Sequence, residues 1–173
     1  TFAMLEQSAN VQGARIIAPR YREPNLEFPF DEVMRAIRFG IRMVVLCNPN
    51  NPTGTPIPRE QSEEIIETAQ NINAGVLVDE AYHEFTRDLT VVDLINKYKN
   101  LFIVRSLSKS MGISSLRAGY VISSEKNIAE KMLGFSEQVI CRCGKEVIIQ
   151  LVPNQWFIKY SDKQLTEKTK IHA

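Results

Sequence analysis

Three polar stretches of this chain carry the residue types that do chemistry, and each follows directly after an apolar run. They span residues 48–54, 79–82 and 106–109. Between them they supply an amine, a carboxylate, a phenol, an amide and hydroxyls. A lysine amine forms an imine with an aldehyde, a carboxylate keeps a ring nitrogen protonated, and hydroxyls with a guanidinium hold a phosphate. Together with an arginine, these groups suit one anionic, aromatic ligand.

A parallel α/β sheet would bring these stretches together. Short apolar runs at 43–47, 76–78 and 101–104 read as buried strands, and helical stretches separate them. In such sheets ligands bind outside the carboxyl ends of the strands. We therefore expect the three polar stretches to form one site at that edge.

The helix between the first two strands has the clearest pattern. Pro58 suits a first helical position, and an apolar face follows at Ile65, Ile66, Ala69 and Ile72. Residues 73–75 should end it. The other expected elements are helices at 2–11, 30–37, 91–95 and 125–135, strands at 15–18 and 117–122, and helices at 139–151 and 155–168. The connection to 117–122 is too short for a parallel crossover, so that strand should be antiparallel.

Composition excludes several classes of protein. The 173 residues are 44% apolar and 24% charged, with a formal net charge of +1. A net charge this close to zero gives no positive field that would attract nucleic acid. No apolar run is long enough to span a membrane. The three cysteines are odd in number, which indicates a reducing, cytoplasmic compartment. Cys141-Arg-Cys143 lacks further ligands, so we expect no metal site.

Pyridoxal 5'-phosphate is a ligand that needs this set of groups, because it must be held at its aldehyde, its ring nitrogen and its phosphate. The motifs are Asn48-Pro-Asn-Asn-Pro-Thr-Gly54, Asp79-Glu-Ala-Tyr82, Ser106-Leu-Ser-Lys109 and Arg117-Ala-Gly-Tyr120. In order and spacing they resemble the fold-type I pyridoxal-phosphate aminotransferases, and most closely the histidinol-phosphate aminotransferase branch. The resemblance implies a three-layer α/β/α fold with a mostly parallel sheet and one antiparallel strand.

The same resemblance assigns roles to the reacting groups. Lys109 would be the Schiff-base lysine, which then moves a proton between the substrate and the cofactor. Asp79 would pair with the pyridine nitrogen and keep it protonated. Asn51 and Tyr82 would donate hydrogen bonds to the phenolic oxygen. Taken alone, Asp79 could instead be a helix cap and Tyr82 an ordinary rim aromatic.

The resemblance also assigns the groups that hold the cofactor in place. Ser106, Ser108 and Arg117 would hold its phosphate. Phe2 occupies the place of an aromatic ring that stacks on the cofactor, although an apolar residue near a helix start is more often part of a core. The family's segment before this aromatic residue is expected to lie outside the chain, as is its small C-terminal domain.

We therefore expect residues 1–135 to be the central part of the cofactor-binding large domain, incomplete at both ends. Residues 136–173 would be a helical continuation toward the absent small domain. The implied reaction moves an amino group from an amino acid or amino alcohol phosphate, such as histidinol phosphate, to a keto acid, 2-oxoglutarate. The alternatives are a same-fold enzyme of another class, such as a phosphothreonine-type decarboxylase, and a catalytically incomplete fragment. The family also implies a homodimer for the complete enzyme.

Overall fold

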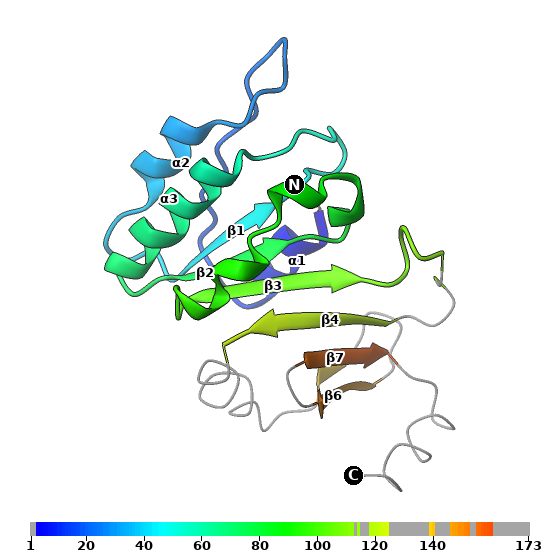
Figure 1. Ribbon diagram of the computed structural model, residues 1–173. Helices are drawn as coiled ribbons and strands as arrows, with labels where there is room; N and C mark the ends of the chain where they lie inside the picture. Colours follow the sequence, from blue (N-terminus) through cyan, green and yellow to red (C-terminus); the bar gives the residue numbers. More distant parts are fainter. Residues whose placement is uncertain are drawn as a thin grey trace, which may run out of the picture.

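The apolar runs of the sequence form the strands of one sheet. The structure, a computed structural model, describes residues 3–112, 114, 118–124, 139–140, 146–152 and 155–160. The strands are β1 (Met43–Cys47), β2 (Gly75–Asp79), β3 (Leu101–Ser106), β4 (Ala118–Ser123), β5 (Val139–Ile140), β6 (Glu146–Val152) and β7 (Gln155–Tyr160). Their order in the sheet is β1-β2-β3-β4-β7-β6-β5. Figure 1 shows this order running from the cyan strand to the brown ones.

The strands that carry the polar stretches are parallel. In β1 and β2, Cys47 lies opposite Asp79, and in β2 and β3, Asp79 lies opposite Val104. The carboxyl ends of all three strands therefore meet at one edge. β4 returns antiparallel to β3, with Tyr120 opposite Arg105. The predicted α/β class, with its parallel strands and antiparallel neighbour, is confirmed.

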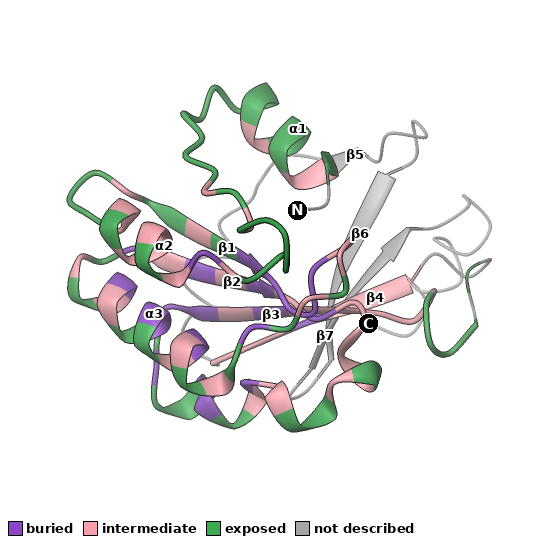
Figure 2. Ribbon diagram, turned by 90° about the horizontal axis from the view of Figure 1, so that it is seen from above, coloured by how far each residue is buried: buried purple, intermediate pink, exposed green. Residues whose placement is uncertain are grey.

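Helices lie on both sides of these strands. The α-helices are α1 (Ala3–Val11), α2 (Phe30–Ala36) and α3 (Arg59–Asn71), and three short 3-10 helices follow β2: η1 (His83–Phe85), η2 (Arg87–Leu89) and η3 (Val92–Asn96). α2 and α3 lie on one side of the sheet and α1 lies on the other (Figures 1 and 2). α1 has no buried residue. The core is covered mainly by α3, with Leu94 and Ile95 of η3 and with partly buried side chains of α2 packed against it.

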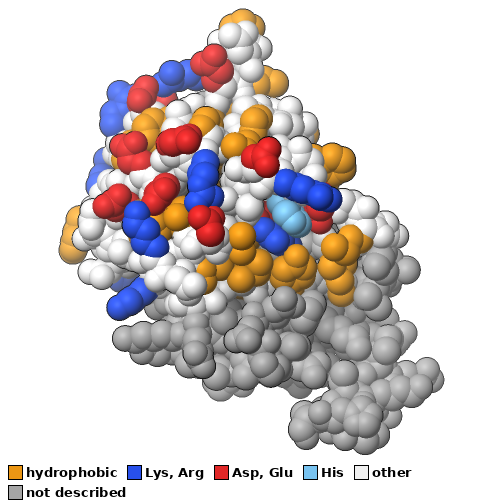
Figure 3. Space-filling view, in the orientation of Figure 1, with side chains coloured by type: hydrophobic (Ala, Val, Ile, Leu, Met, Phe, Trp, Pro, Cys, Tyr) orange, Lys and Arg blue, Asp and Glu red, His pale blue; other side chains and the backbone are white. Residues whose placement is uncertain are grey.

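The core lies between α3 and the sheet. Ile65, Ile66 and Ala69 of α3 have no exposed surface, and they join Val76 and Val78 of β2 in one cluster. Figure 2 shows the buried purple segments of α3 and the strands facing each other. The outer side of this layer carries acidic and basic side chains side by side (Figure 3). This is the amphipathic pattern that the spacing of the helix predicts.

α3 ends where the sequence indicates. Asn73 has a φ of 58°, a left-handed conformation that asparagine tolerates better than most residues. The N–H of Ala74 donates to the carbonyl oxygen of Ala69, so one of the last helical carbonyls is satisfied as the chain turns into β2.

Two sequence expectations were wrong. Residues 15–18 were expected to be a strand, but they are irregular and mostly exposed, because no neighbouring strand pairs with them. Residues 139–151 and 155–168 were expected to be helical, but the described parts are the strands β5, β6 and β7, which pair antiparallel and extend the sheet beyond β4. The expected helix at 125–135 lies outside the described residues.

β1 is also more open than its apolar sequence suggested. It was expected to be covered on both faces, but Met43 is 55% exposed and Val45 is 37% exposed. Both lie on the side away from the core, where the described chain covers β1 only in part. In the part of the chain that the structure describes, no helix combines the length and apolar composition that crossing a membrane requires.

Candidate active site

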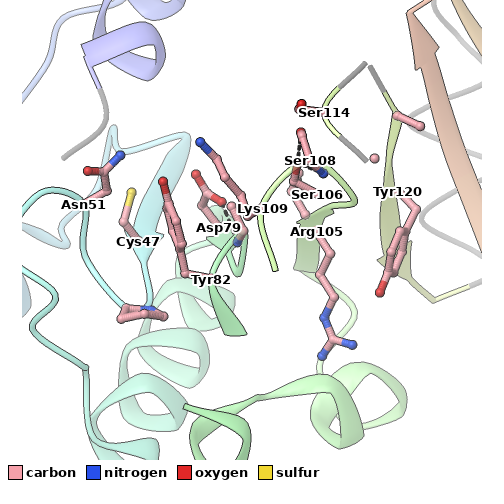
Figure 4. Close-up of a pocket in the computed structure, with 15 residues that line it drawn as sticks. Cys47, Asn51, Asp79, Tyr82, Arg105, Ser106, Ser108, Lys109, Ser114 and Tyr120 are labelled. Carbon is pink, nitrogen blue, oxygen red and sulfur yellow. Dashed lines mark hydrogen bonds between the residues drawn. The ribbon is translucent and has the colours of Figure 1, made fainter. Parts of the chain in front are cut away.

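The loop after β1 is held closed by the side-chain amide of Asn48, which makes two hydrogen bonds to the backbone of Ile57. The Oδ1 atom of Asn48 accepts the N–H of Ile57 at 2.9 Å, and its Nδ2 donates to the Ile57 carbonyl oxygen at 3.2 Å. Inside this closed loop, Gly54 adopts a φ of 71° and donates its N–H to the carbonyl oxygen of Asn50. The result is a tight loop, which presents Asn51 at the rim of the pocket (Figure 4).

The carboxylate at the end of β2 is partly removed from water. Asp79 Oδ1 accepts the N–H of Ala81 at 3.0 Å. Burial raises the pKa of the Asp79 carboxyl above its ordinary value, and the charge of Glu80 adds to this, although the Ala81 N–H and the nearby charge of Lys109 oppose it. A desolvated carboxylate of this kind gains free energy when a positively charged group binds beside it.

The end of β3 supplies the hydroxyls and the amine. Ser106 Oγ and Ser108 Oγ lie 2.6 Å apart, and the N–H of Ser108 donates to Ser106 Oγ at 3.2 Å. Lys109 is exposed, and its Nζ lies 5.2 Å from the centroid of the Tyr82 ring, within cation–π range. The ends of β2 and β3 thus place an amine, a phenol and a pair of hydroxyls within one space.

That space is a single pocket of about 370 Å³, large enough for a small cofactor. Six of the residues that the sequence singled out line it: Asn51, Asp79, Tyr82, Ser106, Ser108 and Lys109. In Figure 4, the carboxylate of Asp79 lies between the Tyr82 ring and the Lys109 side chain. The remaining two, Phe2 and Arg117, lie outside the described residues.

β4 forms one wall of the pocket, and Gly119 allows it to lie close to β3 there. A Cβ atom added to Gly119 would lie 2.7 Å from the carbonyl oxygen of Arg105, which is closer than real Cβ contacts. Gly119 pairs with Ser106 in the sheet, so any larger residue would push β4 away from the strand that carries the hydroxyls. Close packing of β4 against β3 therefore explains why the Arg117-Ala-Gly-Tyr120 motif has a glycine at position 119.

Some pocket residues were missed by the sequence analysis. Cys47, at the end of β1, lines the pocket beside Asn51. Its position opposite Asp79 could have indicated this, since both residues end buried strands. Tyr21 lies near it; burial, and to a smaller extent the nearby Cys47, raises the pKa of Tyr21 to about 12. Among the described residues, no cluster of His, Cys, Asp or Glu could hold a metal ion.

An ion pair at the base of the pocket was also missed, and one of its partners, Arg105, is among the residues that line the pocket. Glu80 is 1% exposed and accepts hydrogen bonds from Arg105 at 2.8 and 2.9 Å. Burial alone would lower the pKa of Arg105, but hydrogen bonds to Glu80 and Tyr120 outweigh burial and raise it. In Figure 4 the guanidinium points away from Lys109. The sequence shows Glu80 inside a motif but gives no sign of its partner.

The chain is similar in sequence to curated proteins that share one name. It is 42% identical over 126 residues to the histidinol-phosphate aminotransferase of Thermoanaerobacter pseudethanolicus, covering 72% of this chain and 34% of that protein. It is 34% identical over 173 residues to that of Sulfurisphaera tokodaii, covering 96% of this chain and 47% of that protein. The chain thus spans less than half the length of these relatives.

The chain is also similar in structure to solved enzymes, each of which it matches over less than half of that enzyme's length. The histidinol-phosphate aminotransferase from Clostridium acetobutylicum matches with a TM-score of 0.72 and 28% identity, over 79% of this chain and 41% of that one. The Sinorhizobium meliloti enzyme in complex with pyridoxal-5'-phosphate matches with a TM-score of 0.59 and 25% identity, over 70% and 33%. L-threonine-O-3-phosphate decarboxylase from Porphyromonas gingivalis matches with a TM-score of 0.62 and 25% identity, over 79% and 39%.

The family model covers almost the whole chain. The model for "Aminotransferase class I and II" matches residues 1–170. This range includes all four motifs and every residue of the pocket described above. The resemblance predicted from the motifs is therefore confirmed. The chain belongs to the class I and II aminotransferases, a family whose cofactor is pyridoxal 5'-phosphate.

Proposed function

We propose that this chain is the cofactor-binding part of a pyridoxal-phosphate-dependent aminotransferase. One observation carries the proposal: a desolvated carboxylate from the end of β2 lines a single pocket together with an amine and a pair of hydroxyls from the end of β3. A structural α/β domain has no need to bury Asp79 at a raised pKa beside an exposed Lys109.

The donor set fits the cofactor at three places. When bound, pyridoxal phosphate supplies an aldehyde that bonds to an amine and a ring that accepts electrons from the substrate. Lys109 is the amine of the pocket, and its position over the Tyr82 ring keeps it within the cavity. We assign to Lys109 both the covalent attachment and the proton transfer at the substrate's α-carbon.

Asp79 is assigned to the ring nitrogen. A carboxylate whose pKa is raised by burial is poorly solvated, so a protonated nitrogen beside it would restore favourable electrostatics. Asn51, on the loop after β1, and Tyr82, beside Asp79 in Figure 4, are assigned to the phenolic oxygen as hydrogen-bond donors. These two positions orient the ring between Asp79 and the loop that follows β1.

The phosphate is assigned to the end of β3. The Ser106 and Ser108 hydroxyls lie 2.6 Å apart and share a hydrogen bond, and by giving up that bond each could donate its proton to an anion. Arg117 and Phe2 remain predictions from the family motif, as a guanidinium on the phosphate and a ring stacked on the cofactor.

The proposed reaction is amino transfer between histidinol phosphate, or a related amino alcohol phosphate or amino acid, and 2-oxoglutarate. The names of the relatives support it. The second candidate is decarboxylation of a phosphorylated amino acid, which the match to the phosphothreonine decarboxylase favours. A third is a fragment that keeps the sheet but does not turn over substrate. We further propose that the whole protein acts as a cytoplasmic homodimer, following the family.

Two measurements test the proposal. Borohydride reduction of the chain with pyridoxal phosphate, followed by peptide mass spectrometry, should place the pyridoxyl group on Lys109; a label on a different lysine would reject the assignment. Histidinol phosphate plus 2-oxoglutarate should then yield glutamate, with this chain or a longer natural protein that contains it. Release of carbon dioxide from phosphothreonine without glutamate would favour the decarboxylase instead, and binding without either product would favour the incomplete fragment.

A further inference from the structure

The buried Glu80–Arg105 ion pair links three of the segments that carry the proposed machinery: the end of β2, the end of β3 and the segment that carries Tyr82. Glu80 follows Asp79 in the chain and extends the pairing of β2 with β3, because its N–H donates to the carbonyl oxygen of Val104. Side chains alternate between faces along a strand. Asp79 therefore faces the pocket, while Glu80 faces the opposite side, among Thr90 and Val91.

The carboxylate of Glu80 receives hydrogen bonds from three directions. Arg105 donates from Nε and a terminal nitrogen to Oε2, at 2.9 and 2.8 Å. The Thr90 hydroxyl lies 2.9 and 3.0 Å from the two carboxylate oxygens, and the N–H of Val91 donates to Oε1 at 3.1 Å. Arg105 also donates to the Thr90 hydroxyl at 2.8 Å. Glu80 is almost fully buried within this network, whereas the Arg105 side chain keeps 13% of its surface exposed.

These partners lie next to the residues of the pocket. Arg105 precedes Ser106 in β3 and lies opposite Tyr120 of β4, which lines the pocket. Thr90 and Val91 end the segment that begins at Ala81 and carries Tyr82. One carboxylate thus fixes the end of β2, the end of β3 and the return of the Tyr82 segment.

From this arrangement we infer that Glu80 and Arg105 are positioning residues: their ion pair holds Asp79, Tyr82 and the Ser106–Lys109 turn at the mutual distances that cofactor binding requires. The inference rests on the proposed function. A buried ion pair is a weak source of stability compared with apolar packing of the same volume, so its presence here is better explained by the geometry that it specifies.

The test compares three variants of the chain. Glu80→Gln keeps the shape of the side chain but removes the charge. Thr90→Val removes one hydroxyl from the network and leaves the ion pair in place, so it remains informative if Glu80→Gln folds poorly. Glu63→Gln is the matched control, because it breaks the Glu63–Lys97 ion pair, 2.8 Å long, outside the pocket lining.

The first measurement is hydrogen exchange on the chain without cofactor. In Glu80→Gln the amides of residues 82–92 should exchange at least about ten-fold faster, while the amides of α3 keep their protection. Thr90→Val should show a smaller increase in the same segment, and Glu63→Gln none there. A uniform increase that includes α3 in both network variants, or no increase in either, would overturn the inference, because the pair would then only stabilise the fold or do nothing.

The second measurement is the dissociation constant of pyridoxal phosphate from an absorbance titration. It should rise about ten-fold in Glu80→Gln and about three-fold in Thr90→Val, and stay unchanged in Glu63→Gln. Tyr82→Phe should weaken binding less when combined with either network variant than it does alone, because both changes act on the same phenol. Wild-type affinity in both network variants, or strictly additive effects of Tyr82→Phe, would overturn the inference.

The two proposals fail in different ways. A wild-type chain that takes no pyridoxyl label on Lys109 contradicts the proposed function, and hydrogen exchange still decides whether Glu80 holds the Tyr82 segment. A labelled wild-type chain whose network variants bind the cofactor normally keeps the function and removes Glu80 and Arg105 from it.

Discussion

The core beneath α3 leaves no surface of Ile65 and Ile66 exposed, whereas the pocket at the strand ends keeps Lys109 in contact with solvent. Both regions are built on the same parallel strands. In the core, β-branched side chains pack against a helix and stabilise the fold. At the pocket, Asp79 is desolvated at a cost to stability. The difference indicates that packing was favoured in one region and chemistry in the other.

A change at Lys109 should give the clearest contrast between the two regions, because it should affect the pocket and leave the core intact. Lys109→Ala should abolish covalent attachment of pyridoxal phosphate, because the pocket's amine is lost. The free energy of unfolding should change by less than about 0.5 kcal/mol, since the side chain is exposed. Borohydride labelling and urea unfolding measure the two effects. Lys99→Ala, at another exposed lysine, is the control and should label normally.

Changing the core should have the opposite result. Ile66 is fully buried, so Ile66→Ala removes apolar contacts and leaves a cavity, at a cost of about 2–5 kcal/mol in the free energy of unfolding. Where the variant still folds, labelling of Lys109 should persist. Val45→Ala, on the more open side of β1, should cost clearly less. Equal losses at the two sites would show that both sides of the sheet are equally packed.

A change at Gly119 should affect both stability and the pocket, because this residue packs within the sheet and also lines the pocket. Gly119→Ala would place a Cβ against the Arg105 carbonyl oxygen, so β4 must shift, at a cost of about 1–3 kcal/mol. The shift should also weaken cofactor binding, because Gly119 pairs with Ser106. Gly75→Ala is a useful control in thermal unfolding, because its added Cβ would meet its nearest neighbour at 3.8 Å, an ordinary contact distance. An unchanged Gly119→Ala variant would contradict the close contact.

The effect on stability expected at Asp79 is smaller than at Ile66 or Gly119, and its sign is unusual. The folded state holds this carboxyl at a raised pKa, so it binds more protons than the unfolded state and loses stability as the pH rises through that window. Asp79→Asn should therefore unfold at higher urea concentration than the wild type at pH 7. The difference should vanish as the pH falls below the carboxyl's ordinary pKa of about 3.9.

The same Asp79→Asn variant should lose activity while it gains stability. Turnover should fall by at least about a hundred-fold if the carboxylate keeps the cofactor ring nitrogen protonated. A wild-type rate would leave Asp79 as a local cap of the following turn. Stability that is lower than the wild type at neutral pH would contradict the desolvation of this carboxyl.

The elements that could be predicted from the sequence are those whose local residue pattern is typical of the structure that they adopt. The runs that became β1, β2 and β3 are short, apolar and followed by turn residues, and Pro58 with its apolar face indicated α3. The location of the pocket followed from these strands alone, since parallel strands end at one edge. The side chains that line it were predicted only where a motif singled them out.

The rest depended on pairing that a single sequence does not reveal. Apolar runs of the length of β6 fit a strand or a buried helix equally well by periodicity, and the β-branched and aromatic residues of β6 and β7 were the neglected signal. Ile16 and Ile17 resembled a strand but found no partner. The contact of Glu80 with Arg105 depends on the register of β2 against β3, which only the structure supplies.

β1 stands at one end of the strand order, with Met43 and Val45 open to solvent. A terminal strand of this kind presents backbone groups that an additional extended segment can use. An extended segment that paired there would lengthen the sheet on the side opposite to β4. Concentrated solutions of the chain therefore call for conditions that discourage edge-to-edge association.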